Sequence, residues 1–236
     1  WNVFRLFQFI FSFKPNTIWV NQIGNRISFV CIPIFKLLKI RVVITLHDYL
    51  VISKYKIAPV GSSLENLNLS SLANPLSLVS KIRHSILCFY VNFADEIICV
   101  SLIQSEILKR FGVKVTQIIN NGIAECDHFD QTKVLDDTSN LLSLRKVEQN
   151  IVLFAGRMNG KGLEILTKAI HESNSKWLLV LAGEIDLAHY CQANLRSEQF
   201  IYLGRLQRKE LLHLMHEVDL VSVISQYYDP YPTIAL

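Results

Sequence analysis

Short apolar runs alternate along the chain with longer segments in which apolar residues recur every three or four positions. The short runs are rich in Val, Ile, Leu and Phe, which is typical of parallel strands buried on both faces. Strands are predicted at residues 16–22, 41–49, 95–101, 115–123, 150–157, 177–184, 199–205 and 219–225. Helices are predicted at residues 25–38, 76–93, 102–112, 162–173 and 209–218, and Gly112 is expected to end the third. This alternation predicts an α/β fold with parallel sheets.

The alternation is interrupted once, between residues 125 and 149, where the sequence is polar and has no clear period. Such a segment favours a linker between two domains. We therefore predict an acceptor-side, Rossmann-like domain at residues 1–130, a linker at 131–149 and a nucleotide-binding domain at 150–236. Two doubly wound domains joined in this way place a ligand in the cleft between them.

The first 13 residues, WNVFRLFQFIFSF, are mostly apolar. The run is too short to cross a bilayer, which needs about 20 apolar residues, and it lacks the initiator Met and cleavage site of a signal peptide. The apolar run at 27–46 contains Lys36, Lys39 and Arg41, so it predicts a helix followed by a strand. No transmembrane segment is predicted, and the chain is expected to begin within a structure.

Composition narrows the class of protein. Half of the residues are hydrophobic and 19% are charged, which indicates a globular chain. The formal charge of +4 suits an anionic ligand or a membrane surface but does not by itself indicate nucleic acid. The five cysteines include no C-x-x-C pair, so neither disulfides nor a zinc site is expected, and a reducing cytoplasm fits best.

The segment FAGRMNGKGLEILTKAI, residues 154–170, has the residue types of an anion site. Glycines let the backbone approach an anion, the following helix offers free N–H groups, and Arg157 and Lys161 add positive charge. Gly156 and Gly160 enclose three residues where a Walker loop has four, and no G-x-G-x-x-G is present. A diphosphate is the natural ligand, although an ordinary strand–helix turn with surface cations explains the segment equally well when it is taken alone.

Other polar groups offer weaker alternatives. His47 lies near the carboxyl end of a predicted buried strand, where open α/β sheets bind ligands, although lone histidines are more often surface or core residues. His213 and His216 are one helical turn apart without a third metal ligand nearby, and CDHFD at 126–130 has irregular spacing in a polar segment. Both are interpreted as surface, and no D-x-D metal motif occurs.

An ordered set of short motifs spans roughly residues 40 to 236. These motifs are TLHDY at 45–49, ADEIICVS at 94–101, INNGI at 119–123, FAGRMNGKG at 154–162, LVLAGE at 179–184, YLGRL at 202–206 and DLVSVIS…YDPYPTIAL at the end. Together they resemble glycosyltransferase family 4, whose members have the GT-B fold of two facing Rossmann-like domains. Two features depart from the family pattern. The interval from Arg157 to Lys161 is one residue shorter than usual, and Asp229 stands where the family has the first Glu of E-x7-E.

The resemblance implies a role for each matching residue. The donor diphosphate would be bound by Gly156, Arg157, Gly160, Lys161, Thr233 and Ile234. The base would contact Gly204, Arg205 and Leu206, while the catalytic residues would be His47, facing the donor sugar, and Asp229. Neither a metal nor another cofactor is expected, since fixed cations stabilise the leaving diphosphate. The second carboxylate of E-x7-E would follow Leu236, so the chain is expected to be an inactive fragment, incomplete at both ends.

The implied function is a retaining glycosyltransferase of the hexosyltransferase type (EC 2.4), which transfers a sugar from a nucleoside-diphosphate donor to a glycan or lipid-linked acceptor. An epimerase on the same fold and an inactive sugar-nucleotide-binding relative remain alternatives. The aromatic and basic N-terminal half suggests peripheral contact with the inner face of a membrane, but its aromatics fit a core equally well. No nucleic-acid partner is expected.

Overall fold

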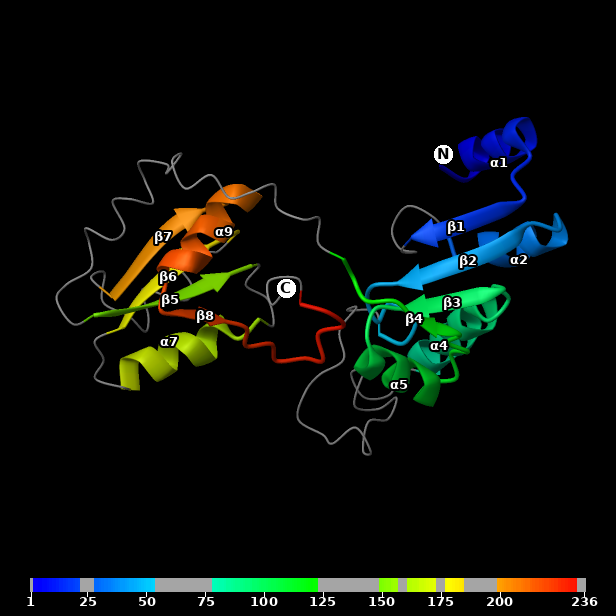
Figure 1. Ribbon diagram of the computed structural model, residues 1–236. Coiled ribbons are helices and arrows are strands. Elements are labelled where there is room, and N and C mark those ends of the chain that lie inside the picture. Colours follow the sequence, from blue (N-terminus) through cyan, green and yellow to red (C-terminus); the bar gives the residue numbers. More distant parts are fainter. Residues whose placement is uncertain are drawn as a thin grey trace. The chain divides into compact units, whose positions relative to one another are not determined.

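The computed structural model describes residues 2–21, 28–53, 78–122, 149–156, 161–172, 177–184 and 199–232. The chain divides into two compact units, and each contains a parallel four-stranded sheet (Figure 1). The first unit comprises Trp1–Gly122 and Tyr227–Thr233, and the second comprises Ile123–Gln226 and Ile234–Leu236. The segment Tyr227–Thr233 therefore belongs to the first unit, although it follows the last strand of the second.

The first unit is built around the buried strand β2. Its elements are α1 (Asn2–Phe13), β1 (Thr17–Asn21), α2 (Cys31–Leu37), β2 (Arg41–Leu46), α4 (Leu78–Val91), β3 (Glu96–Cys99), α5 (Leu102–Arg110) and β4 (Gln117–Ile118). The strands lie in the order β1-β2-β3-β4, and Ile44 of β2 is opposite Val20 of β1 and Ile97 of β3. Val42 and Ile44 are fully buried, as expected for a strand that is covered on both faces.

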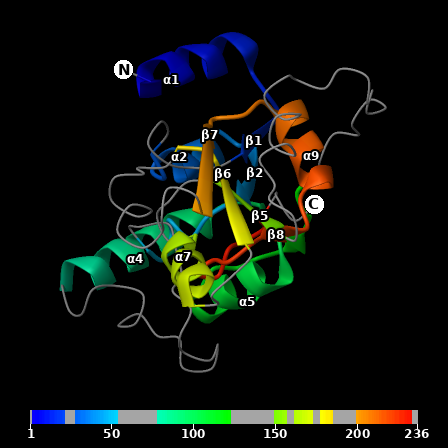
Figure 2. The same ribbon diagram turned by 90° about the vertical axis from the view of Figure 1, so that its left-hand side faces the viewer.

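The second unit has its two faces covered by different helices. Its elements are β5 (Asn150–Ala155), α7 (Leu163–Glu172), β6 (Trp177–Ala182), β7 (Phe200–Gly204), α9 (Arg208–Glu217) and β8 (Leu220–Ser222), with the strand order β7-β6-β5-β8. Val152 and Phe154 pack in the same cluster as Leu166 of α7, whereas the alternate β5 residues pack with Leu214 of α9. Figure 2 shows α7 and α9 on opposite sides of this sheet.

Most of the predicted elements are confirmed, with shorter bounds. The α/β class and every predicted strand are present, but the strand expected at 115–123 is reduced to Gln117–Ile118, and the one expected at 219–225 to Leu220–Ser222. The helix expected at 25–38 begins at Cys31, and residues 25–27 lie outside the described ones. Gly112 ends α5 as predicted, because it adopts φ +83° and the Val113 N–H donates to the Leu108 carbonyl.

The N-terminal apolar run, for which no secondary structure was predicted, forms helix α1. Ile10 is buried in the core of the first unit, and Leu6 packs against that core. Four phenylalanines of the helix are exposed, with Phe4 at 70%, Phe9 at 56%, Phe11 at 64% and Phe13 at 70%. In the part of the chain that the structure describes, no helix is both long and apolar enough to span a bilayer.

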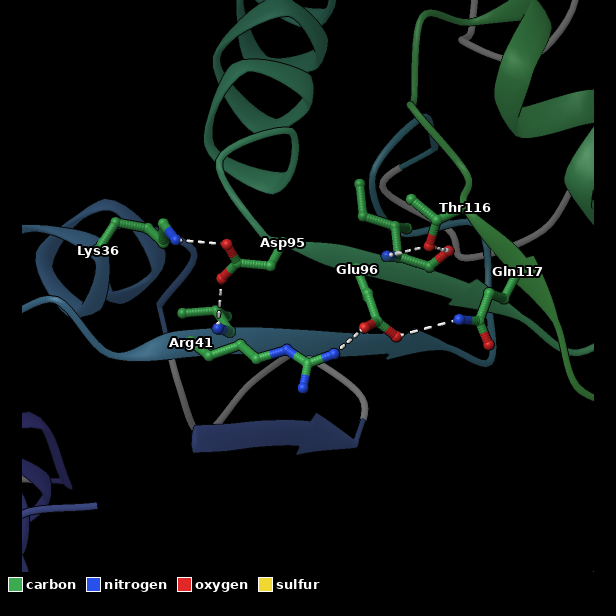
Figure 3. A network of polar contacts seen from close by, with 8 residues as sticks. Lys36, Arg41, Asp95, Glu96, Thr116 and Gln117 are labelled. Atoms are coloured by element: carbon green, nitrogen blue, oxygen red, sulfur yellow. Dashed lines mark hydrogen bonds and ion pairs between the residues drawn. The ribbon is translucent and has the colours of Figure 1, made fainter. Parts of the chain in front are cut away.

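An aspartate closes the amino-terminal edge of each sheet. Asp95 precedes β3, and its carboxylate accepts hydrogen bonds from the Val42 N–H of β2 at 2.7 Å and from the Lys36 ammonium at 2.5 Å (Figure 3). These two donors hold the pKa of Asp95 below its ordinary value. Asp219 precedes β8 in the same way, and its carboxylate accepts from the Ile151 N–H of β5 at 2.7 Å.

A second polar pair lies beside the Asp95 contact in Figure 3. Arg41 donates to the Glu96 carboxylate, which also accepts from the Gln117 amide at 3.2 Å. The side chains of this edge therefore join the starts of three neighbouring strands. The opposite, carboxyl-terminal edge is the one at which open α/β sheets bind ligands.

Candidate functional site

Three glycines bring strand ends together at the carboxyl edge of the second sheet. Gly156 follows β5, Gly183 follows β6, and Gly204 ends β7. The Gly156 N–H donates to the Ala182 carbonyl at 3.0 Å, and the Gly183 N–H donates to the Gly204 carbonyl at 2.7 Å. A Cβ on Gly183 would lie 2.1 Å from the Gly156 carbonyl oxygen, so a side chain does not fit there. The edge is consequently lined by backbone.

The strand order reverses at this edge. β6 and β7 lie on one side of β5 and β8 on the other, which makes the end of β5 a topological switch point. The loop that leaves this point contains Lys161 and leads into α7 through Gly162, whose carbonyl accepts from the Leu166 N–H at 3.0 Å. The N–H groups of the first turn of α7 face no intrahelical acceptor, so this end of the helix suits an anion.

Gly162 also sets where the chain goes after β8. Its φ is +80°, and a Cβ here would lie 2.1 Å from the carbonyl oxygen of Ile224. The backbone that follows β8 therefore runs directly against the start of α7. Arg157 and Gly160, which the sequence assigns to the same loop, lie outside the described residues, as do Thr233 and Ile234.

The three residues expected to contact a base follow β7. Gly204 adopts φ +67° with open space around its missing side chain. Arg205 is exposed, and its guanidinium lies 3.9 Å from the Glu184 carboxylate, which follows β6. Leu206 packs against the cluster between the sheet and α9. These residues share the carboxyl edge of the sheet with Gly156.

His47 lies at the carboxyl edge of the first sheet, directly after β2. Its Nε2 is 2.6 Å from the amide oxygen of Asn21, which ends the neighbouring strand β1. Asp48 folds back on its own turn and accepts from the Leu50 N–H at 2.8 Å. Asn21 was not among the predicted site residues. It could have been found from its place near the end of the predicted strand 16–22, because His47 lies near the end of the next predicted strand.

Tyr49 is the second residue that the sequence analysis did not single out. Its side chain is fully buried, and its hydroxyl has no hydrogen-bond partner among the described residues. Burial, and to a smaller extent the nearby Cys99, Asp229 and Tyr228, raise the pKa of Tyr49 above its ordinary value. The hydroxyl therefore keeps its proton.

The segment that contains Asp229 packs on the first unit beside Tyr49. Tyr228 contacts the core cluster of that unit, which includes Tyr49, and Pro230 is buried. Asp229 itself is half-buried. The carboxylate predicted to be catalytic is thus held between two residues that anchor its backbone to the first unit.

Among the residues that the structure describes, the other chemically reactive groups form no separate site. The described cysteines Cys31, Cys88 and Cys99 are buried free thiols, and burial raises the pKa of Cys88 to about 11 and that of Cys99 to about 12. Such thiols are poor nucleophiles. In the described ranges no group of three or more His, Cys, Asp or Glu side chains is arranged to hold a metal ion, and residues 126–130 lie outside those ranges.

Part of the chain matches a known protein family in sequence. The model of the family described as "Glycosyl transferases group 1" matches residues 142–236, which include the whole carboxyl edge of the second sheet. No curated protein matches the chain in sequence.

Solved structures match nearly the whole chain. Sucrose-phosphate synthase from Thermosynechococcus elongatus has 19% identity and a TM-score of 0.64, over 98% of this chain and 55% of its own. HepE from Anabaena, in complex with UDP and glucose, has 16% identity and a TM-score of 0.61, over 98% and 58%. A UDP-forming α,α-trehalose-phosphate synthase from Burkholderia vietnamiensis has 13% identity and a TM-score of 0.67, over 99% and 58%.

These likenesses establish the fold. The chain has the α/β fold with parallel sheets of these proteins, the GT-B fold predicted from the sequence, and it spans little more than half of their length.

Proposed function

We propose that the protein is a glycosyltransferase that binds a nucleoside-diphosphate sugar at the carboxyl edge of the second sheet. One observation carries the proposal. The switch point between β5 and β8 joins a glycine-lined backbone edge, Lys161 and the N-terminus of α7, within residues that match the glycosyltransferase family model. HepE, a structural neighbour, binds UDP and glucose, which is consistent with this ligand class.

The donor diphosphate binds at the start of α7. Lys161 and Arg157 supply positive charge, and the free N–H groups of the helix supply hydrogen bonds directed at the phosphates. Negative charge grows on the diphosphate as the bond to the sugar breaks, so these fixed donors stabilise the transition state more than the ground state. No metal or other cofactor is required for that step.

Transfer proceeds with retention at the sugar carbon. The leaving phosphate accepts the proton of the acceptor hydroxyl on the face from which it departs, and the acceptor oxygen forms the new bond on that same face. His47 and Asp229 bind hydroxyl groups of the sugar and orient it, and neither needs to act as the general base. Gly204 and Arg205 contact the base through the backbone that follows β7. The enzyme acts in the cytoplasm on a glycan or lipid-linked acceptor.

The diphosphate site is tested by the variant Arg157→Ala in the full-length protein. The change should weaken binding of UDP, GDP or ADP, whichever binds the wild type, by about 1.5–3 kcal/mol, since a hydrogen bond between charged groups is lost. Isothermal calorimetry measures the effect. Lys168→Ala is the matched control, because this change also removes one positive charge, from the exposed face of α7, where Lys168 pairs with Glu172. Equal affinity in Arg157→Ala and wild type contradicts the assignment.

A lipid-linked acceptor also fits the surface of the first unit. Residues 1–122 contain 13 Lys and Arg but five Asp and Glu, whereas residues 123–236 contain 11 and 15. Helix α1 has no acidic residue and exposes stacked Phe9 and Phe13 beside Phe4 and Phe11. We infer that this helix rests on anionic lipid. Two of the cations that suggested membrane contact, Lys36 and Arg41, have carboxylate partners within the sheet, so the aromatic helix is the main contact.

The expected result is co-sedimentation with vesicles that contain anionic lipid, reduced at high salt and weakened by the double change Phe4→Ala and Phe11→Ala. Phe89→Ala is the control, since Phe89 is an exposed phenylalanine of α4. Sedimentation that responds neither to anionic lipid nor to salt contradicts membrane contact and leaves the aromatic surface to a protein partner.

A further inference from the structure

Tyr49 combines complete burial with an unsatisfied polar atom. Its side chain is 0% exposed, and within the described residues its hydroxyl has no hydrogen-bond partner. A buried hydroxyl without a partner costs folding stability relative to one that is bonded. Phenylalanine would fill the same space without this cost. Because nearly all buried polar side-chain atoms are bonded, an exception calls for a role that the free protein does not display.

The surroundings of Tyr49 indicate that role. The residue follows His47 and Asp48 at the carboxyl edge of the first sheet, where ligands bind in open α/β folds. Tyr228 packs on the same core, and the charge of the neighbouring Asp229 adds to burial in raising the pKa of Tyr49. The hydroxyl keeps its proton and is thus a donor, while the oxygens of a carboxylate are acceptors.

We propose that Tyr49 is a positioning residue for Asp229. When a donor sugar is bound, the Tyr49 hydroxyl donates a hydrogen bond to the Asp229 carboxylate, and this bond fixes the carboxylate toward the hydroxyls of the sugar. In the free protein the buried phenol has no partner among the described residues. Its acceptor, the Asp229 carboxylate, becomes aligned with it only when the donor sugar is bound. This inference rests on the proposed glycosyl transfer and names a residue that acts through Asp229, without touching the reacting atoms.

The test is Tyr49→Phe in the full-length protein, because the change removes one oxygen atom and keeps the ring. We expect the rate of transfer from the active member of a UDP-, GDP- and ADP-glucose panel to fall about 10- to 150-fold, as for loss of a hydrogen bond to a charged group. Affinity for the matching nucleoside diphosphate should not change, since that ligand lacks the transferred sugar that Asp229 is proposed to contact. The melting temperature should stay equal or rise, because no bond is lost in the free protein.

A double-mutant cycle with Asp229→Ala identifies the partner of Tyr49. If Tyr49 acts through Asp229, Tyr49→Phe has little further effect on transfer in the Asp229→Ala background. Full additivity overturns the proposal, because it means that Tyr49 contacts the ligand independently of Asp229. A Tyr49→Phe protein that transfers like wild type, or that loses activity together with its stability, overturns it as well.

Failure of the proposed function has a different signature. A wild-type protein that binds no nucleoside diphosphate and transfers from none of the donors overturns the glycosyltransferase assignment and this inference with it. Normal wild-type transfer with an unaffected Tyr49→Phe variant overturns the role of Tyr49 alone.

Discussion

Gly183→Ala is expected to destabilise the second unit by about 2–5 kcal/mol. The residue has φ +126°, where a side chain costs about 1–2 kcal/mol, and its new Cβ would lie 2.1 Å from the Gly156 carbonyl oxygen. That oxygen belongs to backbone whose N–H is bonded to Ala182, so relief of the clash requires the ends of β5 and β6 to separate. Overpacking of this kind adds about 1–3 kcal/mol. The total is a large share of the 5–15 kcal/mol that is typical of a domain.

Urea unfolding followed by circular dichroism measures this loss. Gly204→Ala is the matched control, because Gly204 lies on the same edge at φ +67° but has open space where a Cβ would be. Gly204→Ala should lose only about 1–2 kcal/mol of stability, because an alanine in the left-handed conformation is strained. If the two variants unfold at the same urea concentration, the close approach of Gly183 to Gly156 is not a constraint on the folded unit.

Asp229→Ala should lower kcat/KM for glycosyl transfer about 10- to 150-fold in the full-length protein. The carboxylate is half-buried beside Pro230 and is held near Tyr49, so its hydrogen bonds to a sugar would be charge-assisted and worth about 1.5–3 kcal/mol. Steady-state kinetics with the active nucleotide sugar tests this expectation. Glu172→Ala removes a carboxylate from the exposed face of α7 and serves as the control. Unchanged kcat/KM in a folded Asp229→Ala protein rules out a catalytic role for this carboxylate.

The sequence predicted the structure best where the residues of one strand alone show whether it is buried. Runs such as Val42–Leu46 and Ile151–Ala155 are apolar at every or nearly every position because both faces of a parallel strand are buried, and this pattern is visible without a partner. The place of His47 at a strand end follows from the same pattern. The end of α5 could be predicted for a similar reason. The positive φ of Gly112 is required by the local turn that ends the helix, so no distant segment is involved.

Features that depend on contacts between two segments far apart in the chain could not be predicted from the sequence. The need for glycine at 183 arises only because Ala182 pairs with Ala155 and brings Gly156 alongside. Asn21 becomes a partner of His47 through the register of β1 with β2. Tyr49 looked like an ordinary strand residue, and its meaning depends on a loop near the other end of the chain that packs on the first unit.

The two aspartates at the amino-terminal edges have a consequence for the order of events during synthesis. Asp95 binds a strand that precedes it by 53 positions, and Asp219 binds one that precedes it by 68. At typical translation rates each first strand waits on the order of 3–14 s for the residue that anchors it. During that interval β2 and β5 are apolar segments without their neighbours, β3 and β8. The nascent chain therefore presents two successive windows in which a chaperone, or another nascent strand, can compete for an unpaired edge.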